Sequence, residues 1–178
     1  MPTSRHKTIW RWNCRGYRAK RSQLQAHLST QDKQPDIIAL QGTWSNPKLL
    51  NYTAYTHPEH PQLATLVNRN ICTSASEITN TNIPHVFITL LPVKKEQQPL
   101  HVLNIYSQPK QTIPNSKALL LEALKIAGRQ PLIIVGDINA PHEAWGCHKT
   151  TSKGRKLEES IQTLGLTLHN TPGSAIRI

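Results

Sequence analysis

The chain has 178 residues and a formal net charge of +11, with 21 lysines and arginines against only 10 aspartates and glutamates. This length fits one domain with a real hydrophobic core and excludes two full enzymatic domains. Only three acids are aspartates (Asp32, Asp36 and Asp137), which excludes a metal cage that needs many carboxylates.

The basic balance favours a polyanionic partner, with nucleic acid the first candidate and a membrane surface the second. A basic composition that only aids solubility is the alternative. The apolar runs are strand-sized, which excludes a membrane span, and the first ten residues lack the apolar core of a signal peptide. We therefore expect an intracellular protein with access to the nucleus.

The first half of the chain predicts mainly strands. Residues 8–13 read as a strand that ends in a turn, 18–30 as a helix with Leu24 and Leu28 on one face, and 37–40 as a short buried strand. Residues 42–62, which are rich in proline, read as a loop. Residues 63–68 and 71–78 then read as a hairpin around Arg69 and Asn70.

The second half predicts strands at 85–93 and 100–106, joined by a polar turn. Ser116 begins a helix that runs to about Ala127 and ends at Gly128. An apolar strand at 131–135 follows, then a helix capped by Ser152. Strands are expected at 166–169 and from Ser174 to the last residue.

This order of elements favours an α+β layered sandwich over a regular βαβ alternation. We treat residues 1–178 as one domain. The apolar residues at its carboxy-terminal end predict either an edge strand or a domain that lacks its final strands.

The most specific local signal is the segment Gly136-Asp137-Ile138-Asn139, which follows the apolar strand at 131–135. A carboxylate at a sheet edge can orient or deprotonate a water, and an amide can hold a phosphate oxygen. The same segment is also an ordinary turn. Asn13 and Tyr106 end two other strands, where an amide and a phenol could serve a phosphate or could simply close a turn and the core.

Taken together, several short segments in order resemble the endonuclease domain of non-LTR retrotransposons, within the endonuclease/exonuclease/phosphatase superfamily. The segments are Trp12 to Gly16, Pro35 to Trp44, Asn104 to Ser107, Gly136 to Gly146, and Lys153 to Arg155 with Leu168 to Asn170. The resemblance implies a four-layer α/β sandwich, with two packed, mainly antiparallel β-sheets flanked by helices.

The resemblance also implies hydrolysis of DNA phosphodiester bonds with Mg²⁺ or Mn²⁺, which nicks the target for reverse transcription. In that scheme Asn13 lies at the metal and phosphate, and Tyr106 stabilises the transition state. Asp137 activates the attacking water, and Asn139 holds the scissile phosphate or Asp137. A reverse transcriptase domain is then an expected neighbour in a longer parent protein.

Two departures from the family pattern predict impaired or absent cleavage. The family carries a metal-binding glutamate where this chain has Gly42, which leaves Asn13 as the remaining metal residue of the first strands. The family also ends its site with an Asp-His pair from further strands, and no such pair follows Asn139 here. Because Mg²⁺ is held by only one or two carboxylates, the loss of one predicts weak metal binding.

Eight residues are predicted to contact DNA: Arg15, Arg18, Lys20, Arg21, His142, Trp145, Lys153 and Arg155. For the basic residues on the first helix, a solvated helix face is an equal alternative. His142 and Trp145 are expected to shape their loop, near the DNA. A non-catalytic nucleic-acid-binding module, a phosphatase of the same superfamily and a decayed product without a stable fold remain the rival interpretations.

Overall fold

A computed structural model describes residues 6–79, 81–110 and 116–169 of the chain. The elements in order are β1 (Ile9–Asn13), α1 (Tyr17–Ser29), β2 (Ile37–Gln41), β3 (Tyr52–His57), β4 (His60–Asn68), β5 (Thr73–Ser76), β6 (His85–Leu90), β7 (Leu100–Tyr106), α2 (Ser116–Ala127), β8 (Leu132–Asp137), the 3₁₀ turn η1 (Glu143–Trp145) and α3 (Ser152–Thr163). No helix among them is long and apolar enough to cross a bilayer.

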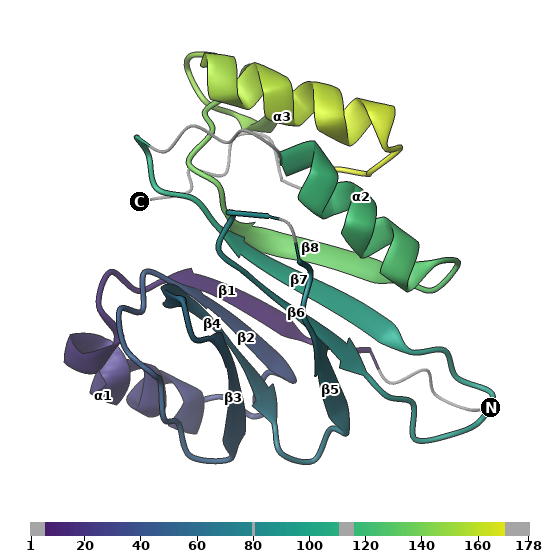
Figure 1. Cartoon of the computed structure of the whole chain (residues 1–178). Coiled ribbons are helices and arrows are strands. Elements are labelled where there is room, and N and C mark those ends of the chain that lie inside the picture. The colour runs from purple at the N-terminus through teal and green to yellow at the C-terminus, as the bar shows by residue number, and fades with distance from the viewer. Residues whose placement is uncertain (1–5, 80, 111–115, 170–178) are drawn as a thin grey trace.

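The described elements form four layers, with α1 outside one sheet and α2 and α3 outside the other (Figure 1). Three clusters of buried side chains fill the three interfaces. Leu24 and Leu28 of α1 pack on the first sheet, and Leu119 and Ala123 of α2 pack on the second. The third cluster lies between the sheets. The expected α+β sandwich is therefore confirmed.

The first sheet has the strand order β1-β2-β4-β3 and the second has β5-β6-β7-β8. In each sheet one pair is parallel, β1 with β2 and β7 with β8, and the other pairs are antiparallel. The two parallel pairs end at the same side of the sandwich, because Asn13 contacts Asp137 across it.

Side chains alternate between the two faces of each strand, and this alternation determines which side chains lie between the two sheets. In β2, Ile38 and Leu40 face α1, while Ile37 belongs to the cluster between the sheets. Because the alternation has a period of two residues, Gln41, four residues after Ile37, also points into the space between the sheets. The same period directs Asn13, Tyr106 and Asp137 into the space between the sheets at the ends of β1, β7 and β8.

Two predictions for the middle of the chain were wrong. Residues 42–62 contain β3 and the start of β4, which form a hairpin around the turn at Pro58 and Glu59. The prolines fit because Pro58 lies in the turn and Pro61 lies at the beginning of β4, where no ladder hydrogen bond is needed. Residues 63–68 do not pair with 71–78, because β5 belongs to the other sheet.

The end of the chain gives a third correction. Residues 166–169 do not form a strand, since none of the described strands pairs with them. The backbone N–H of Leu166 instead donates to Ile161 O at the end of α3. The strand expected from Ser174, and Asn170, lie outside the described residues.

Candidate active site

Two side chains that are 124 positions apart meet where β1 and β8 end. Asn13 Nδ2 donates a hydrogen bond of 2.6 Å to Asp137 Oδ2. The Asn13 Oδ1 atom is buried and has no hydrogen-bond partner in the described part of the chain. The sandwich thus brings together the two residues that the sequence placed at the metal and the water, and leaves one oxygen of the pair available.

The loop after β8 fixes Asp137 from its other side. The backbone N–H of Asn139 donates to Asp137 Oδ1 at 3.2 Å, and Asn139 Nδ2 donates to Ser107 O at 2.9 Å. Asn139 has a positive φ of 48°, a conformation that asparagine tolerates better than most residues. Both carboxylate oxygens of Asp137 therefore accept hydrogen bonds, which hold the group in one orientation.

Gly42 follows β2 and has a φ of +68°. A Cβ atom added there would lie 2.8 Å from Asn13 Oδ1 and 3.1 Å from the Arg15 backbone nitrogen. Asn13 therefore fills the space where a side chain at position 42 would begin. The backbone and its neighbours at position 42 are arranged for a residue without a side chain.

Behind these residues lies a buried amide pair to which the sequence assigned no role. Gln41 Nε2 donates to Asn104 Oδ1 at 2.7 Å, and Asn104 Nδ2 donates to Ala64 O at 3.0 Å. Both side chains are fully buried. A polar residue at an inward position of an otherwise apolar strand was the available signal, in Ile-Ile-Ala-Leu-Gln and in Val-Leu-Asn-Ile. The pair joins the two sheets directly below the site.

Tyr106 pairs in register with Asp137 across β7 and β8. Burial raises the pKa of the Tyr106 phenol, and the Asp137 carboxylate adds to the rise. The phenol therefore keeps its proton at neutral pH and can donate a hydrogen bond to an anionic oxygen.

Lys153 reaches the same edge from the first turn of α3. Its Nζ donates to Ser107 Oγ at 2.9 Å and to Gln108 O at 3.0 Å. Burial lowers the pKa of the Lys153 ammonium to about 8, and the negative charge of Asp137 opposes that change. The structure thus places a residue predicted for DNA contact beside Asp137, with its ammonium partly desolvated.

The start of α3 is held close to the loop after Asn139. Thr151, rather than the predicted Ser152, caps the helix by accepting from the Gly154 N–H at 3.0 Å. A Cβ atom at Gly154 would lie 2.0 Å from Pro141 O. The glycine of Lys153-Gly154-Arg155 therefore permits the close approach that positions Lys153.

His142 and Trp145 shape their loop, as expected. His142 Nδ1 accepts from the Ala144 N–H at 3.0 Å, and Trp145 Nε1 donates to Ala140 O at 3.0 Å. Their ring centroids lie 4.9 Å apart. Both rings have partners within the loop, and a role in DNA contact stays a prediction.

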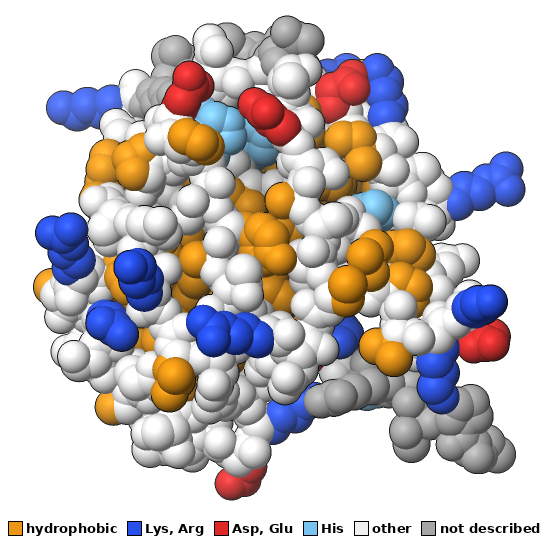
Figure 2. Space-filling model, turned by 60° about the horizontal axis from the view of Figure 1, so that its bottom comes forward, with side chains coloured by type: hydrophobic (Ala, Val, Ile, Leu, Met, Phe, Trp, Pro, Cys, Tyr) orange, Lys and Arg blue, Asp and Glu red, His pale blue; other side chains and the backbone are white. Residues whose placement is uncertain are grey.

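The remaining basic residues predicted for DNA contact lie outside the core. Arg15 follows β1, and Arg18 and Arg21 are exposed on the first turns of α1, where Lys20 is half-buried; Arg155 is exposed on α3. On the face in Figure 2, lysine and arginine side chains are scattered over the lower part and around the margin, with apolar and other side chains between them. That face does not concentrate the charge into a single patch.

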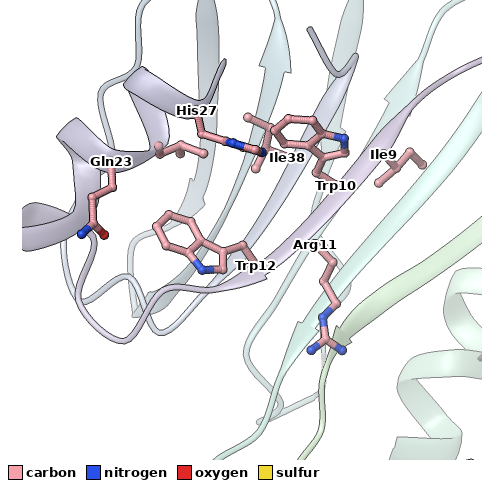
Figure 3. Close-up of a pocket in the computed structure, with 8 residues that line it drawn as sticks. Ile9, Trp10, Arg11, Trp12, Gln23, His27 and Ile38 are labelled. Carbon is pink, nitrogen blue, oxygen red and sulfur yellow. The ribbon is translucent and has the colours of Figure 1, made fainter. Parts of the chain in front are cut away.

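A pocket lies away from this site, between β1 and α1. Trp10, Trp12 and His27 line it, and Arg11 points to the other side of the strand, toward β8 (Figure 3). Arg11 Nη1 donates to Gly136 O at 3.0 Å. Trp10 and Trp12 are partly buried against the cluster under α1, whereas Trp44 is 53% exposed.

Comparison with known proteins agrees with this arrangement. The solved structure titled "Endonuclease domain of TRAS1, a telomere-specific non-LTR retrotransposon" matches with a TM-score of 0.76 at 18% identity, over 93% of this chain and 74% of that one. The chain has the fold of a retrotransposon endonuclease domain. A family model described as "Endonuclease-reverse transcriptase" matches residues 100–178, and no curated protein sequence matches significantly. The resemblance inferred from the sequence motifs is confirmed.

In this endonuclease fold the described residues offer a divalent cation a small set of oxygen ligands. Asp137 is the one carboxylate at the strand ends, and Asn13 Oδ1 is a buried oxygen without a hydrogen-bond partner beside it. Mg²⁺ is bound through one or two carboxylates together with water and substrate phosphate. These oxygen ligands fit a hard cation such as Mg²⁺, but they supply only one negative charge, which is the fewest that such a site uses.

Proposed function

We propose that this domain binds DNA and hydrolyses its phosphodiester bonds slowly, with Asp137 as the residue that acts on the attacking water. The contact between Asn13 and Asp137 carries the proposal, because it assembles a carboxylate and an amide at one edge of an endonuclease fold. The slow rate follows from Gly42, which contributes no carboxylate.

The chain's own residues divide the work around a phosphate. Asp137, held by Asn13 and Asn139, accepts a proton from water or orients it. Tyr106 donates a hydrogen bond to a phosphate oxygen as negative charge develops there, and Lys153 adds positive charge nearby. Asn13 and Asp137 would hold Mg²⁺ or Mn²⁺, which neutralises charge on the phosphate and on the leaving oxygen.

We further propose that DNA is bound mainly through its phosphates. The net charge of +11 and the exposed arginines of α1 favour contacts that do not read sequence. The description of the matching family also supports a reverse transcriptase as the functional partner of this domain.

A plasmid-nicking assay tests the proposal. We expect slow conversion of supercoiled plasmid to the open circle in Mg²⁺ or Mn²⁺, and its loss in Asp137→Ala. Asp32→Ala, which changes an exposed aspartate after α1, is the matched control. Nicking as fast as that of an active deoxyribonuclease would contradict the impairment, and nicking that survives Asp137→Ala would contradict the role of Asp137.

The rival with a specific observation behind it is a DNA-binding domain without catalysis, because Asn13 occupies the space beside Gly42. Under that rival, DNA binding weakens with salt in the usual way, and Asp137→Ala leaves the plasmid result unchanged because no nicking occurs in either protein.

A further inference from the structure

A cluster of histidines lies at the β3–β4 hairpin, outside the site described above. His57 ends β3, Pro58 and Glu59 form the turn, and His60 begins β4. One ligand atom from each of His57, Glu59 and His60 lies within 4.8 Å of the others. The register shift after Thr56 makes His57 and His60 direct cross-strand partners, with ring centroids 4.6 Å apart.

A third histidine reaches this cluster from the opposite sheet. His85 begins β6, is only 3% exposed, and its ring centroid lies 6.2 Å from that of His57. Its Nδ1 lies 2.8 Å from Ile83 O. A carbonyl can only accept, so Nδ1 carries the proton and Nε2 carries the lone pair. A backbone carbonyl that fixes the tautomer in this way is the usual support of a metal-binding histidine.

In His57 the hydrogen-bond partners favour the opposite tautomer, with the proton on Nε2. Its Nε2 lies 3.7 Å from Glu77 Oε1, and its Nδ1 accepts from the Glu59 N–H at 3.2 Å. The proton therefore belongs on Nε2, facing the carboxylate of Glu77. The Nδ1 lone pair can bind a cation once the 3.2 Å hydrogen bond from the Glu59 N–H is broken. Glu77 then orients the ring from behind.

Charge also favours a cation at this place. Two of the ten acids of a chain with a net charge of +11, Glu59 and Glu77, lie beside these histidines.

We propose that this chain binds one zinc ion that fastens the β3–β4 hairpin of the first sheet to β6 of the second, with four ligands: His57, Glu59, His60 and His85. Three imidazoles and a carboxylate suit zinc and complete a four-coordinate shell, whereas Mg²⁺ prefers oxygen ligands. Ligand atoms around zinc lie about 3–4 Å apart. Rotation of the exposed Glu59 side chain and a movement of the His85 ring toward His57, Glu59 and His60 would close the shell.

Such an ion would connect the sheets at the end of the strands where Asn13 and Asp137 also lie, displaced from them along the strand order. His60 begins β4 close to Leu63, which pairs with Gln41, and His85 pairs with Ile105 beside Tyr106. Zinc would therefore act as a structural clamp that sets the spacing between the sheets.

The test uses the full chain, stripped of metal by a chelator and dialysed. Addition of Zn²⁺ at about 100 times its Kd is expected to raise Tm by about 5–10 °C, and calorimetry is expected to give one ion per chain. Mg²⁺ at the same concentration is expected to leave Tm unchanged. A Co²⁺ complex with the visible absorption of a tetrahedral site is expected at the same stoichiometry.

Variants locate the ion. His60→Gln is expected to weaken Zn²⁺ binding at least tenfold, and His85→Gln is expected to do the same if it folds. The exposed His148→Gln is the matched control and is expected to bind as the original chain does. Absence of stoichiometric binding, or binding that is unchanged in His60→Gln or lost in His148→Gln, would overturn the proposal.

Discussion

Gly42, at the end of β2, shapes the site because Asn13 occupies the space that a side chain at position 42 would need. Its positive φ and the 2.8 Å approach of Asn13 Oδ1 to the position of a Cβ atom show that backbone and neighbour are fitted to glycine. A glutamate placed there would strain the backbone and displace Asn13 from Asp137. Gly42→Glu is therefore not expected to accelerate the proposed cleavage.

Alanine substitution measures this fit. Gly42→Ala is expected to lower the free energy of unfolding by at least about 1 kcal/mol more than Gly128→Ala. Gly128 is the matched control, because its φ is +59° and a Cβ atom there meets nothing within 4 Å. Both variants place alanine at a positive φ and strain the backbone, but only in Gly42→Ala does the new Cβ atom lie too close to Asn13 Oδ1. Equal losses in urea unfolding would contradict the packing around Gly42.

Lys153 gives the site a pH dependence. Because the pKa of its ammonium lies near 8 rather than 10.5, Lys153 is charged at pH 7 and loses its charge as pH rises through 8. DNA affinity is therefore expected to fall between pH 7 and 9, and fluorescence anisotropy with a labelled duplex measures it. A bound phosphate favours the charged form and moves the fall upward within this range.

The same lysine has a control one turn along α3. Lys153→Gln is expected to remove the fall in affinity, whereas Lys156→Gln, an exposed change, is expected to keep it with a uniformly weaker affinity. A fall that persists unchanged in Lys153→Gln would show that another group is responsible.

At the scale of elements, the sequence correctly predicted the helices and strands whose capping residues or apolar runs match their place in the folded structure. The bounds of α2 followed from Ser116 and Gly128, and β7 and β8 followed from apolar runs, which are buried in β7 and mostly half-buried in β8. The sequence failed at β3 because prolines were taken as loop markers, although Pro58 occupies the turn of a hairpin. It failed at β5 because nothing local tells a strand which sheet to join.

Part of the site was predictable for the same reason. Asn13, Tyr106 and Asp137 end strands, and strand ends are visible in a sequence. The buried pair of Gln41 and Asn104 required knowledge of which faces of the two sheets meet. The position of Lys153 beside Ser107 depends on how α3 docks, which no local pattern encodes.

The docking of α3 can be tested at Gly154. Helix propensity alone predicts that Gly154→Ala stabilises the protein by about 1 kcal/mol. The 2.0 Å approach to Pro141 O predicts the opposite, a loss of about 1–3 kcal/mol from overpacking. We expect a lower Tm, and a solvent-exposed Ser152→Ala as control with little change. A rise in Tm for Gly154→Ala would contradict the close packing of α3 on this loop.

At the scale of the whole molecule, two sheets packed face to face bring the ends of β1, β2, β7 and β8 to one edge. This is the arrangement of a retrotransposon endonuclease domain, with one carboxylate at the strand ends. Under the proposed function, the positive charge of the chain would favour attraction to DNA, and cleavage would depend on how strongly a single carboxylate can retain a metal.

The dependence of plasmid nicking on Mn²⁺ concentration tests this account most directly. With Asp137 as the only carboxylate that the described residues place where β1, β2, β7 and β8 end, half-saturation is expected at about 1 mM or above. Asp137→Ala is expected to abolish the dependence. Saturation at micromolar Mn²⁺ with rapid nicking would contradict the account, because it would require a complete set of metal ligands at a site where Gly42 provides none.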